Sequence, residues 1–204
     1  MRGILFASMV WAGTAVADPV DQVFAAATES FDRMPALRMV DEIAGNCGAD
    51  TSVNAEVAFC TTANRVFLTT TARQQPYAPY LVAHVLGHAV QVQHGMADVA
   101  LREIRQRRSE ERQLRTYVES QVNCIAGVLY QRAGLPTASL TDWFDNEPLT
   151  DPHWGRNPLR QGPTVSITLD TANAWFQQGQ RAGDPAVCAV GEFGADLLIA
   201  ADKG

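Results

Sequence analysis

The stretch AHVLGHAVQ, residues 83–91, contains two histidines four positions apart. In a helix, residues at i and i+4 lie on one face, so the imidazoles of His84 and His88 point to the same side. Two imidazoles placed in this way suit a zinc ion, which requires at least one further protein ligand. The same spacing also fits two histidines hydrogen-bonded within an apolar core, and the pair alone does not separate these interpretations.

A third ligand is available at Glu119, which lies 31 residues after His88 on the next predicted helix. Asn123 follows four residues later on the same face, and its amide oxygen could accept a hydrogen bond from a ligand histidine and orient the ring. An amide supplies no negative charge, so we expect zinc to be held less tightly here. The alternative third ligand, His94, requires the chain to turn at position 91, where the sequence has Gln91 rather than glycine.

Hydrophobic periodicity and turn residues predict the elements that carry these side chains. The apolar sequence YLVAHVLGHAVQVQ predicts a buried central helix that starts near Pro76 and Pro79 and ends at Gly95. The other predicted elements are a helix over 19–44 that Pro35 could interrupt, a hairpin formed by EVAFC and RVFLTTT, a second long helix over 97–132, an irregular segment over 134–163, and a short helix over 170–182. We therefore expect an α+β fold, mostly helical with a small antiparallel hairpin or sheet, in which two central helices carry the site.

The charge pattern argues against nucleic acid or anionic lipid as a partner. The chain has 16 basic and 22 acidic residues and a net charge of −6, so it has no bulk attraction to polyanions. Acids and bases interleave along the first half of the 97–132 helix, with i,i+4 pairs Glu103–Arg107, Arg107–Glu111 and Glu111–Arg115. This pattern is typical of a solvated helical face rather than a basic binding patch.

The first residues, MRGILFASMVWAGTAVADPV, have the organisation of a secretory signal peptide. Arg2 is followed by a short apolar stretch, and Ala15-Val16-Ala17 forms a small-x-small cleavage site. We expect a signal peptide over 1–17 and a single domain over 18–204, which would be periplasmic or secreted and would have no membrane segment after cleavage. An uncleaved anchor is the alternative.

Four cysteines, at positions 47, 60, 124 and 188, lie after this segment. An even number in an exported protein predicts two disulfides, for which three pairings are possible. Cys47 and Cys60 flank a short loop-like segment, so we pair them and leave Cys124 with Cys188.

Four motifs together resemble the bacterial neutral zinc metallopeptidases, a zincin-type family. YLVAHVLGHAVQ is similar to that family's YVxAHExGHxVQ, ESQVNCIAGV to its ELQADCxAGV, Cys47-Gly48 with FCTTANRVFL to its CG…YCPxDxxVYLD, and WFQQGQRAGDPAVC to its WFxxGxxxGDPxxC. Order and spacing agree from about residue 45 to 190.

The resemblance implies a zincin-like fold in which His84, His88 and Glu119 bind zinc and Asn123 supports a ligand histidine. It implies the same two disulfides. It also implies that RVFLTT is an edge strand beside the site, so that an extended peptide or protein segment could add as a further strand near Phe67.

Three positions depart from the family pattern. Val85 stands where the family has the glutamate that serves as general base, and valine cannot accept a proton. Asn123 replaces an aspartate, and Ala63 occupies the acidic position of CPxD. Tyr117 and His153 are candidate substitutes for the base, although no spacing supports either.

These features predict an exported metallopeptidase homologue that has lost ordinary peptidase activity, retains zinc in a weakened site and binds a peptide or protein. One alternative is an active zinc-dependent hydrolase with a non-standard base. The other is a metal-free interaction domain in which His84, His88, Glu119 and Asn123 form a buried polar cluster.

Overall fold

The computed structural model describes residues 17–155 and 165–204 of the chain. The predicted signal peptide therefore lies almost entirely outside the described residues. The helices are α1 (Pro19–Ser30), α2 (Thr70–Arg73), α3 (Ala78–Gln93), α4 (Met96–Gln106), α5 (Glu111–Arg132), α6 (Leu169–Ala182) and α7 (Asp196–Ala201), with short 3₁₀ turns at Arg108–Glu110, Leu140–Asp142 and Pro185–Cys188. The strands are β1 (Ala36–Val40), β2 (Val57–Cys60), β3 (Arg65–Thr69) and β4 (Trp154–Gly155).

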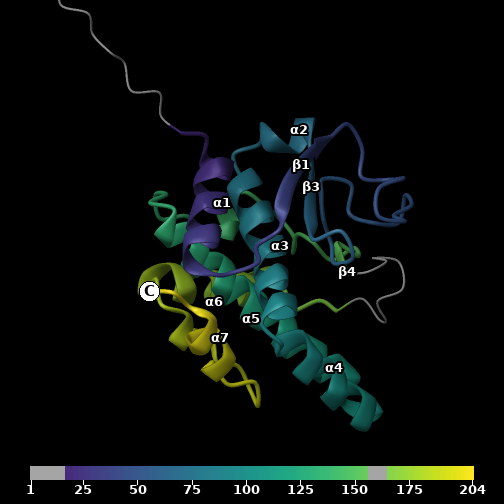
Figure 1. The fold of residues 1–204 in the computed structure, drawn as a ribbon, viewed down its shortest axis with the longest axis vertical. Coiled ribbons are helices and arrows are strands. Elements are labelled where there is room, and N and C mark those ends of the chain that lie inside the picture. The colour runs from purple at the N-terminus through teal and green to yellow at the C-terminus, as the bar shows by residue number, and fades with distance from the viewer. Residues whose placement is uncertain (1–16, 156–164) are drawn as a thin grey trace, which may run out of the picture.

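The helix α3 occupies the centre of the fold, with the sheet and α5 packed against it (Figure 1). It is buried nearly all round, as its continuous apolar sequence predicts, and every residue from Ala78 to Gln91 is inaccessible to solvent. α6 packs against α5, and α4 projects away from the body of the molecule. No helix among the described residues is long and apolar enough to cross a membrane.

The four strands form one mixed sheet in the order β1-β3-β2-β4. The predicted hairpin is confirmed, because β2 and β3 pair antiparallel with Val57 opposite Leu68 and Cys60 opposite Arg65. β1 and β4 add to its two sides as parallel neighbours.

The prediction of helix over the whole of 19–44 is wrong after Ser30. Proline restricts the residue before it to extended conformations, and Arg33 adopts a left-handed φ of 59°, so the helix ends before Pro35. The next five residues then satisfy the backbone groups on the free side of β3 and become β1. As a consequence β3 is an internal strand, so the prediction that RVFLTT is an edge strand is wrong and the strand that contains Phe67 has no free side.

The long helix predicted over 97–132 is two helices. The chain leaves helical geometry at Arg107, where φ is −126° and ψ is 62°. The guanidinium of Arg107 bonds Glu110 and also Glu192 from the C-terminal segment, at 3.1 and 2.6 Å. These contacts replace the expected pairing with Glu111, which binds Arg108 and Arg115 instead.

Both predicted disulfides are present. Cys47–Cys60 ties the loop before β2 to the end of that strand, and Cys124–Cys188 ties α5 to the 3₁₀ turn after α6. The α5–α6 contact near the second bridge is very close: a Cβ on Gly127 would lie 2.0 Å from the Phe176 carbonyl oxygen. The two helices therefore meet backbone to backbone, which fixes the orientation of α5.

Candidate metal centre

Two of the predicted ligands lie on the same face of α3. His84 is 2% exposed and His88 is fully buried. Gly87 lies between them at the crossing with α5, where a Cβ would lie 3.1 Å from the carbonyl oxygen of Val122. The missing side chain lets the two helices approach closely, which brings the carboxylate of Glu119 within reach of both imidazoles.

Glu119 projects from α5 toward these two rings. Its Oε2 lies 3.5 Å from His84 Nε2, and its Oε1 lies 3.7 Å from His88 Nε2. Charge-assisted hydrogen bonds between nitrogen and oxygen are about 2.7–2.9 Å long, so the carboxylate is held near the imidazoles without a direct bond.

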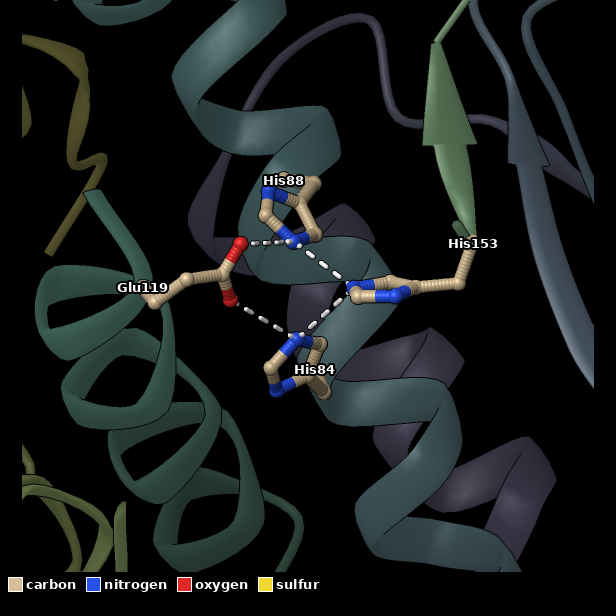
Figure 2. A group of neighbouring side chains, drawn as sticks. All are labelled: His84, His88, Glu119 and His153. Atoms are coloured by element: carbon tan, nitrogen blue, oxygen red, sulfur yellow. Dashed lines mark hydrogen bonds and ion pairs between the residues drawn. The ribbon is translucent and has the colours of Figure 1, made fainter. Parts of the chain in front are cut away.

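A third histidine completes the group from the opposite side. His153 immediately precedes β4, and its Nε2 lies 3.1 Å from Nε2 of His84 and 3.1 Å from Nε2 of His88. Figure 2 shows the four side chains converging on one region from α3, α5 and the approach to β4. One ligand atom from each residue can be chosen so that all four lie within 4.8 Å of one another.

These distances fit a metal ion. Donor atoms around a tetrahedral zinc ion with bonds of about 2.0–2.1 Å lie roughly 3.3–3.4 Å apart. Four of the separations, 3.1 to 3.7 Å, lie close to that value, although the two Glu119 distances are to different carboxylate oxygens, and with one atom chosen per residue the spread reaches no more than 4.8 Å. Three imidazole nitrogens and one carboxylate oxygen are also a donor set that zinc prefers. The residues present therefore fit zinc.

The local environment keeps the three imidazoles neutral, which is the form that binds a metal. Burial lowers the pKa of His84 to about 3, against smaller opposing effects of the Asn123 amide and the Glu147 carboxylate. Burial, reinforced by the neighbouring imidazoles, also holds the pKa of His88 well below its usual value and lowers that of His153 to about 4. Burial raises the pKa of Glu119 to about 7, with Glu147 adding to the effect.

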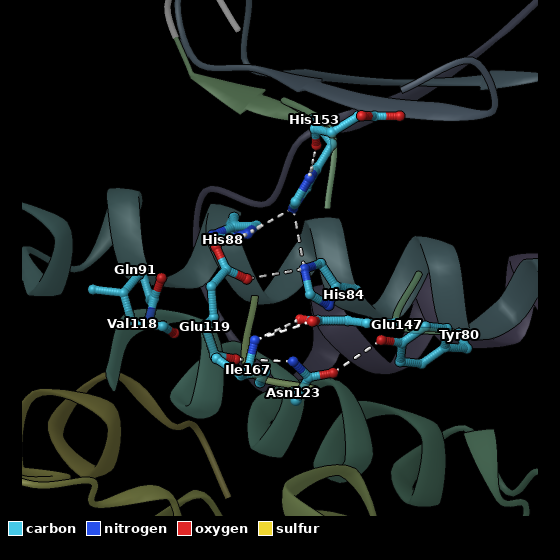
Figure 3. A network of polar contacts seen from close by, with 11 residues as sticks. Tyr80, His84, His88, Gln91, Val118, Glu119, Asn123, Glu147, His153 and Ile167 are labelled. Carbon is cyan, nitrogen blue, oxygen red and sulfur yellow. Dashed lines mark hydrogen bonds and ion pairs between the residues drawn. The ribbon is translucent and has the colours of Figure 1, made fainter. Parts of the chain in front are cut away.

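The hydrogen bonds of Asn123 go to Tyr80 and Glu119 rather than to an imidazole, although its amide lies near enough to His84 to oppose the lowering of that pKa. Its Oδ1 accepts a hydrogen bond from the Tyr80 hydroxyl at 2.9 Å, and its Nδ2 donates to the Glu119 carbonyl oxygen at 2.9 Å (Figure 3). The Nδ1 atoms of His84 and His88 are buried without a hydrogen-bond partner among the described residues. The amide therefore fixes the backbone of α5 at the ligand position instead of orienting an imidazole.

Val85 is fully buried and belongs to the main hydrophobic core, so the position of the family's base contributes only packing. Tyr117 packs edge-on against Phe193, away from the imidazoles, and does not replace it. Glu147 is the nearby carboxylate that sequence reasoning missed. Its oxygens accept hydrogen bonds from the backbone N–H groups of Ile167 and Thr168, which fastens this loop to the start of α6.

A groove borders the metal centre on the side of α4. Glu119 and His153 are the members of the four-residue group that line it. Its other lining residues are mainly apolar and come from α4, α5 and the segment before β4: Ala97, Ala100, Leu101, Ile104, Arg115, Val118, Leu149, Thr150, Asp151, Pro152, Trp154 and Val165. His84 and His88 thus lie behind Glu119 and His153 as seen from the groove.

The structure brings together His84, His88 and Glu119 as predicted and leaves His94 outside. α3 continues through Gln91, and His94 Nε2 lies 3.2 Å from the Asp32 carbonyl oxygen instead. His153, predicted only as a candidate base, is a fourth potential ligand. Its sequence signal is compositional, since three of the chain's four histidines belong to this group.

Comparison with protein families agrees with this geometry. Residues 6–190 match the family model described as "Putative neutral zinc metallopeptidase". The chain matches none of the curated proteins and none of the solved structures with which it was compared. The family match covers most of the 204 residues and contains all four side chains of the metal centre. The chain therefore belongs to the neutral zinc metallopeptidase family.

Proposed function

We propose that this protein is an exported member of the family that holds zinc, does not hydrolyse peptides, and binds a peptide or protein segment in the groove beside the metal centre. The observation that carries the proposal is the pairing of a complete donor set with a fully buried valine at the position of the general base. Such a base contributes about 10²- to 10⁴-fold to a rate, so its loss removes ordinary turnover.

The surroundings of the site support the absence of a substitute base. Glu119 belongs to the metal centre, and the oxygens of Glu147 accept hydrogen bonds from the backbone N–H groups at the start of α6. Glu147 also lines a different hollow, together with Tyr77 and Phe144. Among the described residues that line the groove, Asp151 is the second carboxylate after Glu119. An active hydrolase would have to use Asp151 as its general base.

The groove supports the binding part of the proposal. One wall is the apolar face of α4, formed by Ala97, Ala100 and Ile104, and Arg115 adds a positive charge beside Glu119. Apolar clefts with a few polar groups are the usual form of ligand sites, and this cleft is partly open to solvent.

Two disulfides support export, because such bonds form and persist mainly in oxidising compartments. The signal-like first 17 residues agree with this. The periplasm and the cell exterior are equally compatible.

The test is to measure zinc content and casein hydrolysis on the purified mature protein and on His84→Ala. Near one zinc per chain, lost in His84→Ala, with no hydrolysis by either, would support the proposal. Hydrolysis by the native protein that is abolished in both His84→Ala and Asp151→Asn would instead establish an active enzyme with a substitute base. A native protein that binds no zinc under saturating metal would leave a metal-free interaction domain.

A further inference from the structure

The position of His153 is fixed through its own backbone and through the next residue. Its carbonyl oxygen accepts a hydrogen bond from the Phe59 N–H at 2.8 Å, and the next residue, Trp154, pairs with Phe59 in the sheet. The indole of Trp154 stacks on the ring of His88 with centroids 4.4 Å apart and planes at 14°. His153 is therefore tied to β2 by its carbonyl oxygen and is followed directly by β4 and by a ring that packs on α3, although it lies in a segment with little regular structure.

The protonation of His153 is fixed by its own hydrogen bond. Its Nδ1 lies 2.7 Å from the carbonyl oxygen of Asp151, which can only accept, so Nδ1 must carry the proton. Nε2 then carries no proton, and its lone pair is directed at His84 and His88. Zinc ligands are typically oriented by this kind of bond, in which the second ring nitrogen donates to a backbone carbonyl or a carboxylate.

The four side chains are largely withdrawn from solvent. His84, His88 and His153 are between 0% and 4% exposed, and the Glu119 side chain is 18% exposed. From the groove, Glu119 and His153 cover the two imidazoles of α3. Catalytic zinc sites hold the metal with three protein ligands and leave one position for water or substrate, whereas structural sites use four protein ligands.

We propose that His153 is the fourth zinc ligand and that it closes the coordination sphere, making this a structural zinc centre. The inference rests on the proposed function, since it requires that the site holds zinc. A closed centre joins the segment before β4 to α3 and α5 through the metal and leaves no coordination position for water. It also accounts for Val85, because a general base has no proton to remove where no water is bound.

The experiment uses the mature protein loaded with Zn²⁺ or Co²⁺, together with His153→Ala and the control His94→Ala, which removes a histidine outside the group. X-ray absorption at the zinc edge counts imidazoles, chelator competition measures zinc affinity, and visible absorption of the Co²⁺ form reports its geometry. Azide is added to the Co²⁺ form to detect an exchangeable position.

We expect three imidazoles in the native protein, a tetrahedral Co²⁺ spectrum and no response to azide. His153→Ala should lose one imidazole, bind zinc on the order of 100-fold or more weakly, because outer contacts alone change affinity about 10- to 100-fold, and respond to azide. Free imidazole should restore the native spectrum in this variant, which also shows that the variant is folded. His94→Ala should behave as the native protein.

Two imidazoles and an azide response in the native protein, with zinc affinity unchanged in His153→Ala, would overturn the closed centre and leave zinc binding intact. A native protein that binds no zinc would overturn the proposed function itself. The two failures are therefore distinguishable.

Discussion

Replacing Val85 by the family's glutamate distinguishes two possibilities. In the first, the site lacks only its general base. In the second, it also lacks a coordination position for water. Val85 follows His84 on α3, is fully buried, and packs in the main core. A simple loss of the base predicts that Val85→Glu recovers hydrolysis. A closed centre predicts that it does not, and that activity requires Val85→Glu combined with His153→Ala.

The stability cost of Val85→Glu follows from this burial. Losing a fully buried valine costs about 1.5–3 kcal/mol, and burying a poorly partnered polar group adds about 1–3 kcal/mol. The sum, about 2.5–6 kcal/mol, is a large part of the 5–15 kcal/mol typical of a domain, so we expect a folded variant with a clearly lowered Tm. Val85→Gln is the matched control, because glutamine is nearly isosteric with glutamate and polar but cannot act as a base.

The assay is hydrolysis of casein by zinc-loaded proteins below the lowest Tm of the set. The double variant Val85→Glu with His153→Ala should exceed Val85→Gln with His153→Ala by about 10²-fold or more, the contribution of a general base. Val85→Glu alone should match Val85→Gln alone. Equal activity in Val85→Glu with and without His153→Ala would refute the reasoning, because it would show that His153 does not obstruct the reaction.

Three further predictions concern stability and are read from thermal unfolding. Removing zinc with a chelator should lower Tm by about 8–16 °C at metal concentrations near 1,000 times Kd, since such binding adds about 4 kcal/mol and each kcal/mol shifts Tm by about 2–4 °C; an unchanged Tm would mean that the metal does not tie the elements together. Gly127→Ala, which normally favours a helix, should instead cost about 1–3 kcal/mol, because its methyl group would lie 2.0 Å from the Phe176 carbonyl oxygen; a rise in Tm would contradict the close α5–α6 contact. The two hydrogen bonds from Arg132 lower the pKa of Asp202 below 3.8, so this pair stabilises the fold above that pH and stops doing so as pH falls through the lowered value. Asp202→Asn should therefore lower Tm at pH 7 and have a diminishing effect at pH below about 3.8, and a deficit that persists in acid would point to lost packing instead.

The parts of the fold that sequence reasoning predicted well depend on local signals. α3 is apolar nearly all round, and the glycine two residues after its end has a φ of 87°, so its position follows from composition and one turn residue. The β2–β3 hairpin follows in the same way from β-branched and aromatic residues on both sides of a short turn. The predicted ligands on α3 and α5 meet because i,i+4 spacing is a property of the helix itself.

The parts that were wrong depend on partners distant in the sequence. β1 forms because the free side of β3 offers backbone groups to pair with. No residue pattern within 36–40 predicts this pairing. α4 and α5 separate at Arg107, whose guanidinium binds Glu192, 85 positions away in the sequence. Asn123 has the residue type for orienting an imidazole, yet its oxygen accepts from Tyr80, 43 positions earlier.

The sequence points first to His84 and His88 as ligands, whereas the structure anchors the ring of His153 by a hydrogen bond that the other two rings lack. His84 and His88 form the recognisable pair, but their Nδ1 atoms have no hydrogen-bond partner among the described residues. His153 has no spacing signal, yet its Nδ1 is anchored to the Asp151 carbonyl and its backbone to β2. A ligand oriented in this way keeps its lone pair directed at the metal without help from its neighbours, whereas the α3 imidazoles depend on helix packing for their orientation. Zinc affinity should therefore fall when the Cys47–Cys60 bridge at the end of β2 is removed by Cys47→Ser with Cys60→Ser, and a chelator titration of that variant measures it. Unchanged affinity would show that the anchoring of His153 does not depend on this bridge.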